Sequence, residues 1–424
     1  MSAVGAQTPE SWTVAVLRAS WRYGLSSLGP VAVSAAHFIA SLFFLRLLRP
    51  LEFGQFSFLL IVVPFCLSAT GALLGAPAAL TRGKAAAVAA AELLTLQKAS
   101  LVVSLIAGVV VTVLMVSTGA ILATAWLFGF YGVFYTLRSF ARSYANVHGR
   151  IGNVAASDVC YAVLLVAGLS ALALSGNFTL HNAAIALVFS SAVAQLPFGT
   201  GYLRDLVRAT GTPLSAYRPM WHDITRWSLL GVALTEVAAN AHAYLVTFIS
   251  GPGAFGLLAL GALFMRPASL VLGALPDIDQ PVMARKLAEG DLKGAFRVVN
   301  EFRTAAGAVL AATILLAVVL VTWFPHLLLK HYAVNDVWVV LFFWAAITAL
   351  RALRTPDTVF IQATGGYATL ARISGVSSVV ALVATLALLL AFGPLLSLGG
   401  VLAGEIVIVW MVFPITNGWR RRIA

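Results

Sequence analysis

The amino-acid sequence predicts an all-α integral membrane protein with twelve transmembrane helices, arranged as two parallel-repeat six-helix bundles around a central cavity. Three observations predict this fold. The composition is strongly apolar, long apolar segments follow one another along the whole chain, and one short motif occurs once in each half.

The composition indicates that most of the surface contacts lipid rather than water. Of the 424 residues, 61% are apolar and 10% are charged, and the mean hydropathy is +0.95. Soluble domains carry about 25% charged residues. Both cysteines, Cys66 and Cys160, lie within apolar runs, which favours small buried side chains over a disulfide or a metal site.

The apolar segments are long enough to cross a bilayer as helices. A hydrocarbon core of about 30 Å requires about 20 apolar residues in a helix. The runs are continuous rather than alternating, which favours helices over strands. Twelve segments meet this condition: 25–48, 53–76, 98–117, 119–137, 156–176, 181–201, 228–250, 254–276, 304–325, 336–354, 372–393 and 396–418.

Lysine and arginine are distributed unequally between the two sides of these spans. Of the 27 Lys and Arg residues, 23 fall in the N-terminal arm, the tail and the links after even-numbered spans. Arg46, Arg49 and Lys330 fall on the opposite side, and Arg266 lies inside a span. Positive residues mark cytoplasmic links, so both termini are expected in the cytoplasm. The net charge of +12 is thus explained by topology and by attraction to membrane lipids, without a nucleic-acid partner.

The longest link divides the chain into two halves. Because each half has an even number of spans, both bundles enter the membrane in the same direction. A second polar link, 277–303, has apolar residues three or four apart, which predicts a short helix on the inner membrane surface. The expected units are a cytoplasmic amphipathic arm over 1–24, bundles over 25–201 and 228–418, a cytoplasmic linker over 202–227 and a basic tail over 419–424.

The repeated motif occupies the same link in each half. Residues 49–54 read R-P-L-E-F-G, and residues 251–256 read G-P-G-A-F-G. Each copy joins the first and second spans of its half. The identical positions are separated by 202 residues and are Pro50 and Pro252, Phe53 and Phe255, and Gly54 and Gly256.

The segment L-R-L-L-R-P-L-E-F-G over 45–54 resembles the R-x-L-G-P-x-x-[FY]-G signature of polysaccharide and O-antigen flippases. That family belongs to the multidrug/oligosaccharidyl-lipid/polysaccharide exporter superfamily, with the multidrug and toxin extruders and the lipid II flippase. The second copy of the motif and E-G-D-L-K-G-A-F over 289–296 also resemble family segments. Arg49 departs from the signature, where glycine is usual.

The resemblance implies a fold, a cargo and a location. The fold would be a V-shaped pair of bundles whose central cavity, lined by spans one, two, seven and eight, opens to each side in turn. The cargo would be an undecaprenyl-diphosphate-linked oligosaccharide, moved from the inner to the outer leaflet of the bacterial inner membrane. Polysaccharide polymerase or chain-assembly proteins would be partners.

Arg266 is the first candidate for a substrate-binding residue. It lies twelve residues into its span, about 18 Å deep at 1.5 Å per residue. A charge in hydrocarbon costs about 2.5 to 17 kcal/mol, and a guanidinium can donate to phosphate oxygens two at a time. We therefore expect Arg266 to bind the diphosphate of the cargo. Pro267 frees a backbone carbonyl, which predicts a kink beside Arg266.

Glu236, Asn240 and His37 are expected to line the cavity with Arg266. Glu236 falls at the depth of Arg266, so the two would form either a structural ion pair or a pair that breaks when anionic cargo or a proton arrives. Asn240 lies one turn from Glu236 on the same helix face, whereas His242 is expected to point elsewhere. For His37 the alternatives are a cavity role and a helix-to-helix hydrogen bond.

Glu405 in the last span is either a helix-packing partner or a carboxylate that couples transport to H⁺ or Na⁺. Gln195 and Asp158 are expected in helix packing. We find no P-loop, catalytic triad or metal-ligand cluster in the sequence, so we expect neither an enzyme nor a cofactor.

The sequence favours two functions, which we rank in order. The first is the lipid-linked oligosaccharide flippase. The second is a cation-coupled multidrug or small-molecule exporter of the same fold, with Glu236 or Glu405 as the coupling carboxylate. A membrane glycan polymerase ranks third, because the longest extracytoplasmic link, 326–335, is too short to hold acceptor sugars.

Overall fold

The computed structural model describes residues 12–81, 84–329 and 331–421, with side chains from residue 29 onward except at 224, 234, 237, 238, 277, 327 and 328. Residues 1–11 of the predicted arm and 422–424 of the predicted tail lie outside the described residues. Within the described ranges the chain forms helices joined by short turns, without strands.

The N-terminal lobe is built from six long helical segments. A π-helical turn and the short α3 continue α2, and α8 follows α7 after one tight turn. Helix α1 is unbroken, so no turn separates residues 12–24 from the first span, and the place of the arm at the membrane surface stays a prediction. The bounds are α1 Trp12–Leu47, α2 Pro50–Thr70, the π-helical turn Gly71–Gly75, α3 Ala76–Leu80, α4 Ala86–Ser117, α5 Leu122–Val147, α6 Ile151–Leu174, α7 Leu180–Val193 and α8 Gly199–Ala209.

The C-terminal lobe repeats this plan with six more segments. Short helical turns, including α9 Arg218–Met220, form the linker between the lobes. Each of the twelve predicted spans coincides with one helical segment. The bounds are α10 Arg226–Ser250, α11 Pro252–Phe264 with α12 Arg266–Ala288, α13 Leu292–Trp323, α14 Pro325–Leu328, α15 Val334–Ala363, α16 Tyr367–Phe392 and α17 Pro394–Arg420.

Length and apolar composition support this count for most of the helices. Nine helices in the described part of the chain are long and apolar enough to cross a membrane, and α11 with α12 makes a tenth when the bent pair is one span. Helices α5 and α10 do not reach that threshold. Both are polar for membrane helices: α5 carries Tyr131, Tyr135 and Arg138, and α10 carries Glu236 and Asn240.

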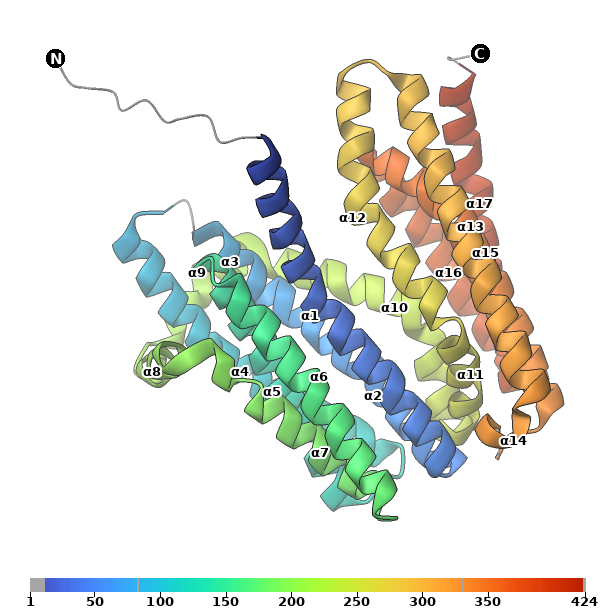
Figure 1. The fold of residues 1–424 in the computed structure, drawn as a ribbon, viewed down its shortest axis with the longest axis horizontal. Coiled ribbons are helices and arrows are strands. Elements are labelled where there is room, and N and C mark those ends of the chain that lie inside the picture. The colour runs from blue at the N-terminus through green and yellow to red at the C-terminus, as the bar shows by residue number, and fades with distance from the viewer. Residues whose placement is uncertain (1–11, 82–83, 330, 422–424) are drawn as a thin grey trace.

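The two lobes share a core at one end of the molecule and have separate cores at the other. The shared core contains Phe58 of α2 and Leu258 of α11. A second core, around Phe140, belongs to the N-terminal lobe, and a third, around Phe302, belongs to the C-terminal lobe. Figure 1 shows that α2 and α11 lie side by side near the α1–α2 and α10–α11 links, whereas α1 and α12 diverge toward the opposite end. We call these the link end and the terminal end.

The α1–α2 link accommodates Arg49 because its backbone is extended. Arg49 has φ −72° and ψ 157°, whereas its counterpart Gly251 has φ +89°, which favours glycine. The side chain of Glu52 accepts a hydrogen bond from the Arg49 N–H at 3.1 Å and so caps α2. The two copies of the motif therefore begin their helices through different turns.

The short surface helix predicted within 277–303 is wrong. Helix α12 ends at Ala288 and α13 begins at Leu292, after a turn in which Gly290 has φ +75°. The apolar positions that include Phe296 and Phe302 are buried in the core of the C-terminal lobe. The amphipathic period thus serves packing between α13 and its neighbours instead of binding at the membrane surface.

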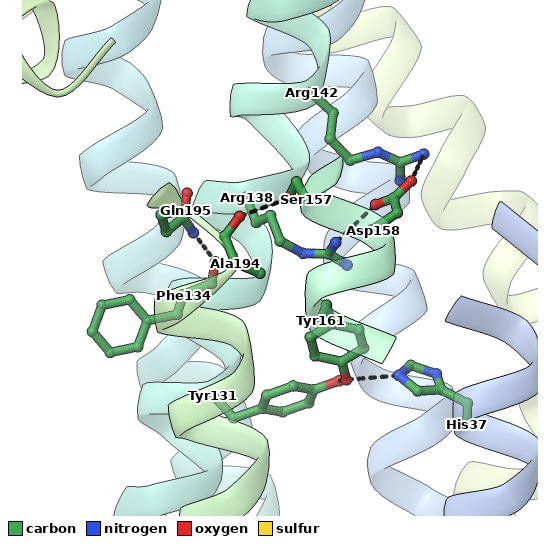
Figure 2. A network of polar contacts seen from close by, with 10 residues as sticks. All are labelled: His37, Tyr131, Phe134, Arg138, Arg142, Ser157, Asp158, Tyr161, Ala194 and Gln195. Carbon is green, nitrogen blue, oxygen red and sulfur yellow. Dashed lines mark hydrogen bonds and ion pairs between the residues drawn. The ribbon is translucent and has the colours of Figure 1, made fainter. Parts of the chain in front are cut away.

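Several arginines assigned to cytoplasmic links lie within helices and bind carboxylates. Arg138 of α5 is 2% exposed, and its Nη1 is 2.8 Å from Oδ1 of Asp158 on α6, which is 0% exposed. Arg142 approaches Oδ2 of the same carboxylate at 3.1 Å (Figure 2). The rings of Tyr135 and Tyr161 lie against the Arg138 guanidinium, at 4.7 and 4.5 Å to their centroids. The packing role expected for Asp158 is confirmed.

A second buried carboxylate, Asp357 of α15, is held in the same way. Arg303 of α13 approaches it at 2.5 Å, and Arg420 of α17 at 3.7 Å. We call a carboxylate that is bound by two arginines a clamp. The Asp357 clamp joins α13, α15 and α17, whereas the Asp158 clamp joins the consecutive helices α5 and α6. Each clamp leaves one positive charge in excess.

Asp158→Asn is expected to destabilise the N-terminal lobe, because it leaves two arginines in the lobe without a counter-charge. Breaking a buried pair by removing one partner costs about 3–5 kcal/mol. The measurement is the midpoint of thermal unfolding of the purified protein. Glu92→Gln is the control, because its pair with Lys84 is at the surface and exposed pairs contribute about 0–1 kcal/mol. Equal midpoints for the two variants would contradict a structural role for the clamp.

Candidate functional site

A cavity of about 220 Å³ lies between the lobes. Helices α1 and α2 form one wall, and α10, α11, α12 and α15 form the other. These are the four spans that the family resemblance implied, with the tenth span added. The polar groups on the walls belong to Ser41, Ser57, Asn240, His242 and Arg266.

Arg266 stands at a break in the helix that lines the cavity. It is the first residue of α12, and α11 and α12 are inclined by 60°. Pro267 cannot donate to the carbonyl of Leu263, so the helical hydrogen bonding is interrupted there. Ser269 donates its hydroxyl to the carbonyl oxygen of Met265 at 3.1 Å on the far side of the break. The predicted kink is confirmed, and the positive end of the α12 dipole adds to the charge of the guanidinium.

The guanidinium of Arg266 has no carboxylate partner in the part of the chain that the structure describes. None of the ion pairs there includes it. Glu236, expected at the same depth, accepts a hydrogen bond from the Tyr244 hydroxyl at 2.9 Å instead. The structure therefore has a half-buried cation between the lobes, and the ion pair with Glu236 is not formed. The expectation that Glu236 lines the cavity is wrong, because its carboxylate is turned to Tyr244 and it is not among the lining residues.

Asn240 and His242 both line the cavity. The expectation that His242 points elsewhere is wrong. Its buried ring lies edge-on to that of Trp344, with 5.8 Å between the centroids. The reason is the position of α10, which runs obliquely between the lobes and packs against α2 on one side and α16 on the other (Figure 1). Helix α10 still exposes side chains such as Trp227 and Phe248, but Asn240 and His242 both reach the cavity.

His37 forms a helix-to-helix hydrogen bond beside the cavity and does not line it. Its Nε2 lies 2.8 Å from the hydroxyl of Tyr161 on α6, and that hydroxyl lies 3.1 Å from the hydroxyl of Tyr131 on α5 (Figure 2). Gln195, in the same view, donates to the carbonyl oxygen of Phe134 at 2.8 Å, as expected for a packing residue. The network holds α1 against α5 and α6.

Glu405 is a third clamp. It is 6% exposed, and Nε of Arg351 and Nε of Arg354 each lie 2.6 Å from one of its oxygens. A carboxylate with both oxygens bound to guanidinium groups has little room for a transported cation. The geometry is that of the helix-packing alternative, with α15 and α17 joined through it.

Sequence analysis missed the arginines of the clamps. Arg351 and Arg354 lie on the fourth long helix of their lobe, as do Arg138 and Arg142 on theirs. The sequence places both pairs in cytoplasmic links because they follow the end of an apolar run. The signal that could have identified them is their spacing of three or four residues, which places both arginines of a pair on one helix face.

Comparison with solved structures identifies the fold. No protein-family model and no curated sequence matches the chain. An inward-facing multidrug resistance MATE family transporter of the MOP superfamily aligns with a TM-score of 0.69 and 14% identity, over 94% of this chain and 98% of that chain. The lipid II flippase MurJ, in an inward closed conformation, aligns with 0.66 and 12%, over 92% and 87%. An outward-facing MATE transporter gives 0.52 and 14%, over 94% of each chain.

These structures belong to transporters and a flippase, not to enzymes. Their likeness covers 92–94% of this chain and therefore extends over both lobes. The chain therefore has the fold of the MOP-superfamily transporters and of the lipid II flippase MurJ.

Proposed function

We propose that this protein is an alternating-access flippase that moves an undecaprenyl-diphosphate-linked oligosaccharide from the inner to the outer leaflet for surface polysaccharide assembly. The observation that carries the proposal is the Arg266 guanidinium on the cavity wall, without a carboxylate partner among the described residues. An uncompensated cation in a membrane protein is costly. A diphosphate would compensate it, because its oxygens match the paired donors of a guanidinium.

The other cavity groups suit the polar part of such a cargo. Asn240 and His242 lie on the wall with Arg266, and Ser57 faces them from α2. A volume of about 220 Å³ is below the range of about 300–1,000 Å³ that is usual for drug-sized ligands. The cavity as it stands would admit the diphosphate and its nearest groups, and a whole glycan would require the lobes to separate. The lipid tail would remain in the bilayer.

Separate cores at the terminal end support a conformation that opens toward that end. The higher TM-score with an inward-facing transporter, 0.69 against 0.52 with an outward-facing one, agrees with it. The excess of Lys and Arg assigns the terminal end to the cytoplasm. We place the protein in the bacterial inner membrane with both termini cytoplasmic, and with polysaccharide polymerase or chain-assembly proteins as partners.

A cation-coupled exporter of small molecules is the second candidate, and the surroundings of Glu236 favour it. Asp158, Asp357 and Glu405 are each clamped by two arginines. Glu236 has the Tyr244 hydroxyl as its hydrogen-bond partner and takes part in no ion pair of the described chain. It is therefore better placed than Glu405 to bind H⁺ or Na⁺. The two candidates differ in the cargo that they carry.

Arg266→Gln is expected to impair transport of a fluorescent undecaprenyl-diphosphate glycan in proteoliposomes. Hydrogen bonds to charged groups contribute about 1.5–3 kcal/mol, so the apparent affinity should fall about tenfold to a hundredfold. Arg266→Lys keeps the charge without the paired donors and should be intermediate. Arg372→Gln, an exposed position that does not line the cavity, is the control and should transport normally. Normal transport by Arg266→Gln at a normal protein level would remove Arg266 from the mechanism.

Glu236→Gln is expected to lose coupling to an ion gradient, and Glu405→Gln is expected to lose stability. Loss of the Glu236 charge should abolish the effect of a proton or sodium gradient on transport, with thermal stability retained. Loss of the Glu405 charge should lower the unfolding midpoint, because it opens a clamp. Drug efflux and lipid-linked glycan export, measured in the same vesicles, separate the two cargo classes. Gradient-dependent transport that survives in Glu236→Gln would exclude that residue from coupling.

A further inference from the structure

The two copies of the repeated motif meet in space. Helix α2 begins at Pro50 and α11 begins at Pro252, so each copy opens a helix at the link end. These helices lie side by side (Figure 1). Segments 202 residues apart in the sequence thus form the two halves of one contact between the lobes.

The contact joins main-chain atoms at Gly54 and Gly256. A methyl group on Gly54 would overlap the carbonyl oxygen of Pro252. A methyl group on Gly256 would lie 3.0 Å from the carbonyl oxygen of Pro50 and 3.2 Å from Cα of Gly54. Backbone atoms cannot rotate aside as a flexible side chain can, so only glycine fits at position 54, and a methyl group at position 256 would require the neighbouring backbone to shift by a few tenths of an ångström. Each glycine touches the proline carbonyl of the other copy, which makes the contact reciprocal, as in a two-fold interface.

The cavity begins next to this contact. Phe53 and Phe255, the residues before the two glycines, are buried and line the cavity. The ring of Phe58 lies edge-on to Tyr244 and Phe255, with centroids 5.5 and 6.3 Å away, and extends the aromatic layer across both lobes. At the terminal end the two lobes have no shared core among the described residues.

The hydroxyl of Tyr332 is buried against the same contact without a hydrogen-bond partner in the described chain. It would lie 3.0 Å from a methyl group on Gly256, and it comes from the turn between α14 and α15. A buried hydroxyl without a partner is unfavourable, and separation of the motifs would return it to water. The closed contact therefore contains one group that favours opening.

We propose that the duplicated motif is the outer gate of the transporter. The main-chain contact between Gly54 and Gly256 holds the gate shut, and the buried hydroxyl of Tyr332 keeps the closure reversible. This inference rests on the alternating-access part of the proposed function and on the assignment of the link end to the outside. It does not depend on the cargo.

Cysteine accessibility tests the gate without any cargo. Cys66 and Cys160 are replaced by alanine, and Ser57→Cys places one thiol on the cavity wall. A membrane-impermeant maleimide added to intact cells then labels molecules whose cavity is open to the outside. Gly54→Ala and Gly256→Ala should each raise the labelling rate several-fold, because the motifs can no longer close. Tyr332→Phe should lower the rate, because the closed contact loses its unfavourable group.

Two glycines serve as controls, Gly253 within the second copy of the motif and Gly71 at the opposite end of the α2 span. A methyl group on Gly253 would meet the Leu51 backbone at 3.8 Å, an ordinary contact, and one on Gly71 meets nothing within 4 Å. Neither Gly253→Ala nor Gly71→Ala should change the labelling rate. Membrane level and thermal unfolding are measured for every variant. If Gly54→Ala does not reach the membrane, the less crowded Gly256→Ala and Tyr332→Phe carry the test.

Unchanged labelling in both Gly256→Ala and Tyr332→Phe would overturn the proposal, as would an equal increase in Gly253→Ala. The expected labelling pattern in a protein that exports no lipid-linked glycan would support the gate and refute the proposed cargo. The gate and the cargo can therefore fail separately.

Discussion

Compensation of buried charge is the constraint on which this structure depends. An ion removed from water is stable inside a protein only with partners of opposite charge. The three buried carboxylates of the described chain, Asp158, Asp357 and Glu405, each take two arginines from neighbouring helices. Against this background, Arg266 and Glu236 stand out as ionisable residues near the interface of the lobes that are not compensated in this way. Arg266 and Glu236 are therefore the first candidates for a functional role.

The clamps also reveal how the two lobes have diverged. In both, a pair of arginines sits on the fourth long helix, α5 or α15. The N-terminal pair binds a carboxylate from α6, the fifth helix, whereas the C-terminal pair binds one from α17, the sixth. The arginine pair occurs on the same helix of each lobe, but the carboxylate that it binds comes from a different helix. A shared architecture therefore does not imply shared internal contacts, and each lobe has to be interpreted from its own residues.

The sequence predicted the link-end boundaries of the spans better than the terminal-end boundaries. The span expected from 254 begins at Pro252, and the one expected from 336 begins at Val334, because an apolar run ends sharply at a short turn. At the terminal end, the span expected from 304 begins at Leu292, because a polar helix continues beyond the lipid and packs on its lobe. Hydropathy detects the lipid boundary and not the end of the helix.

The position of the cavity residues along their spans was predictable from the sequence, but the orientation of their side chains around the helix was not. Counting residues along a span placed Arg266 and Asn240 correctly in the interior, and both line the cavity. The same counting turns His242 away from the cavity, which is wrong, and the structural ion pair that it allows between Arg266 and Glu236 is not formed. The orientation of a side chain around its helix depends on how α10 is inclined between the lobes, which is a property of tertiary packing. A single sequence does not contain that information in readable form.

Sealing by glycine backbone has a consequence for how such a protein can change over time. In the proposed gate the contacting atoms, at Gly54 and Gly256, belong to the main chain, which every amino acid has, whereas the proposed cargo contacts, at Arg266, Asn240 and His242, belong to particular side chains. In this proposal, side chains determine which cargo is bound, and the main chain closes the cavity to water. Substitutions in the cavity could therefore change the cargo during evolution without altering the glycine contact that closes the gate.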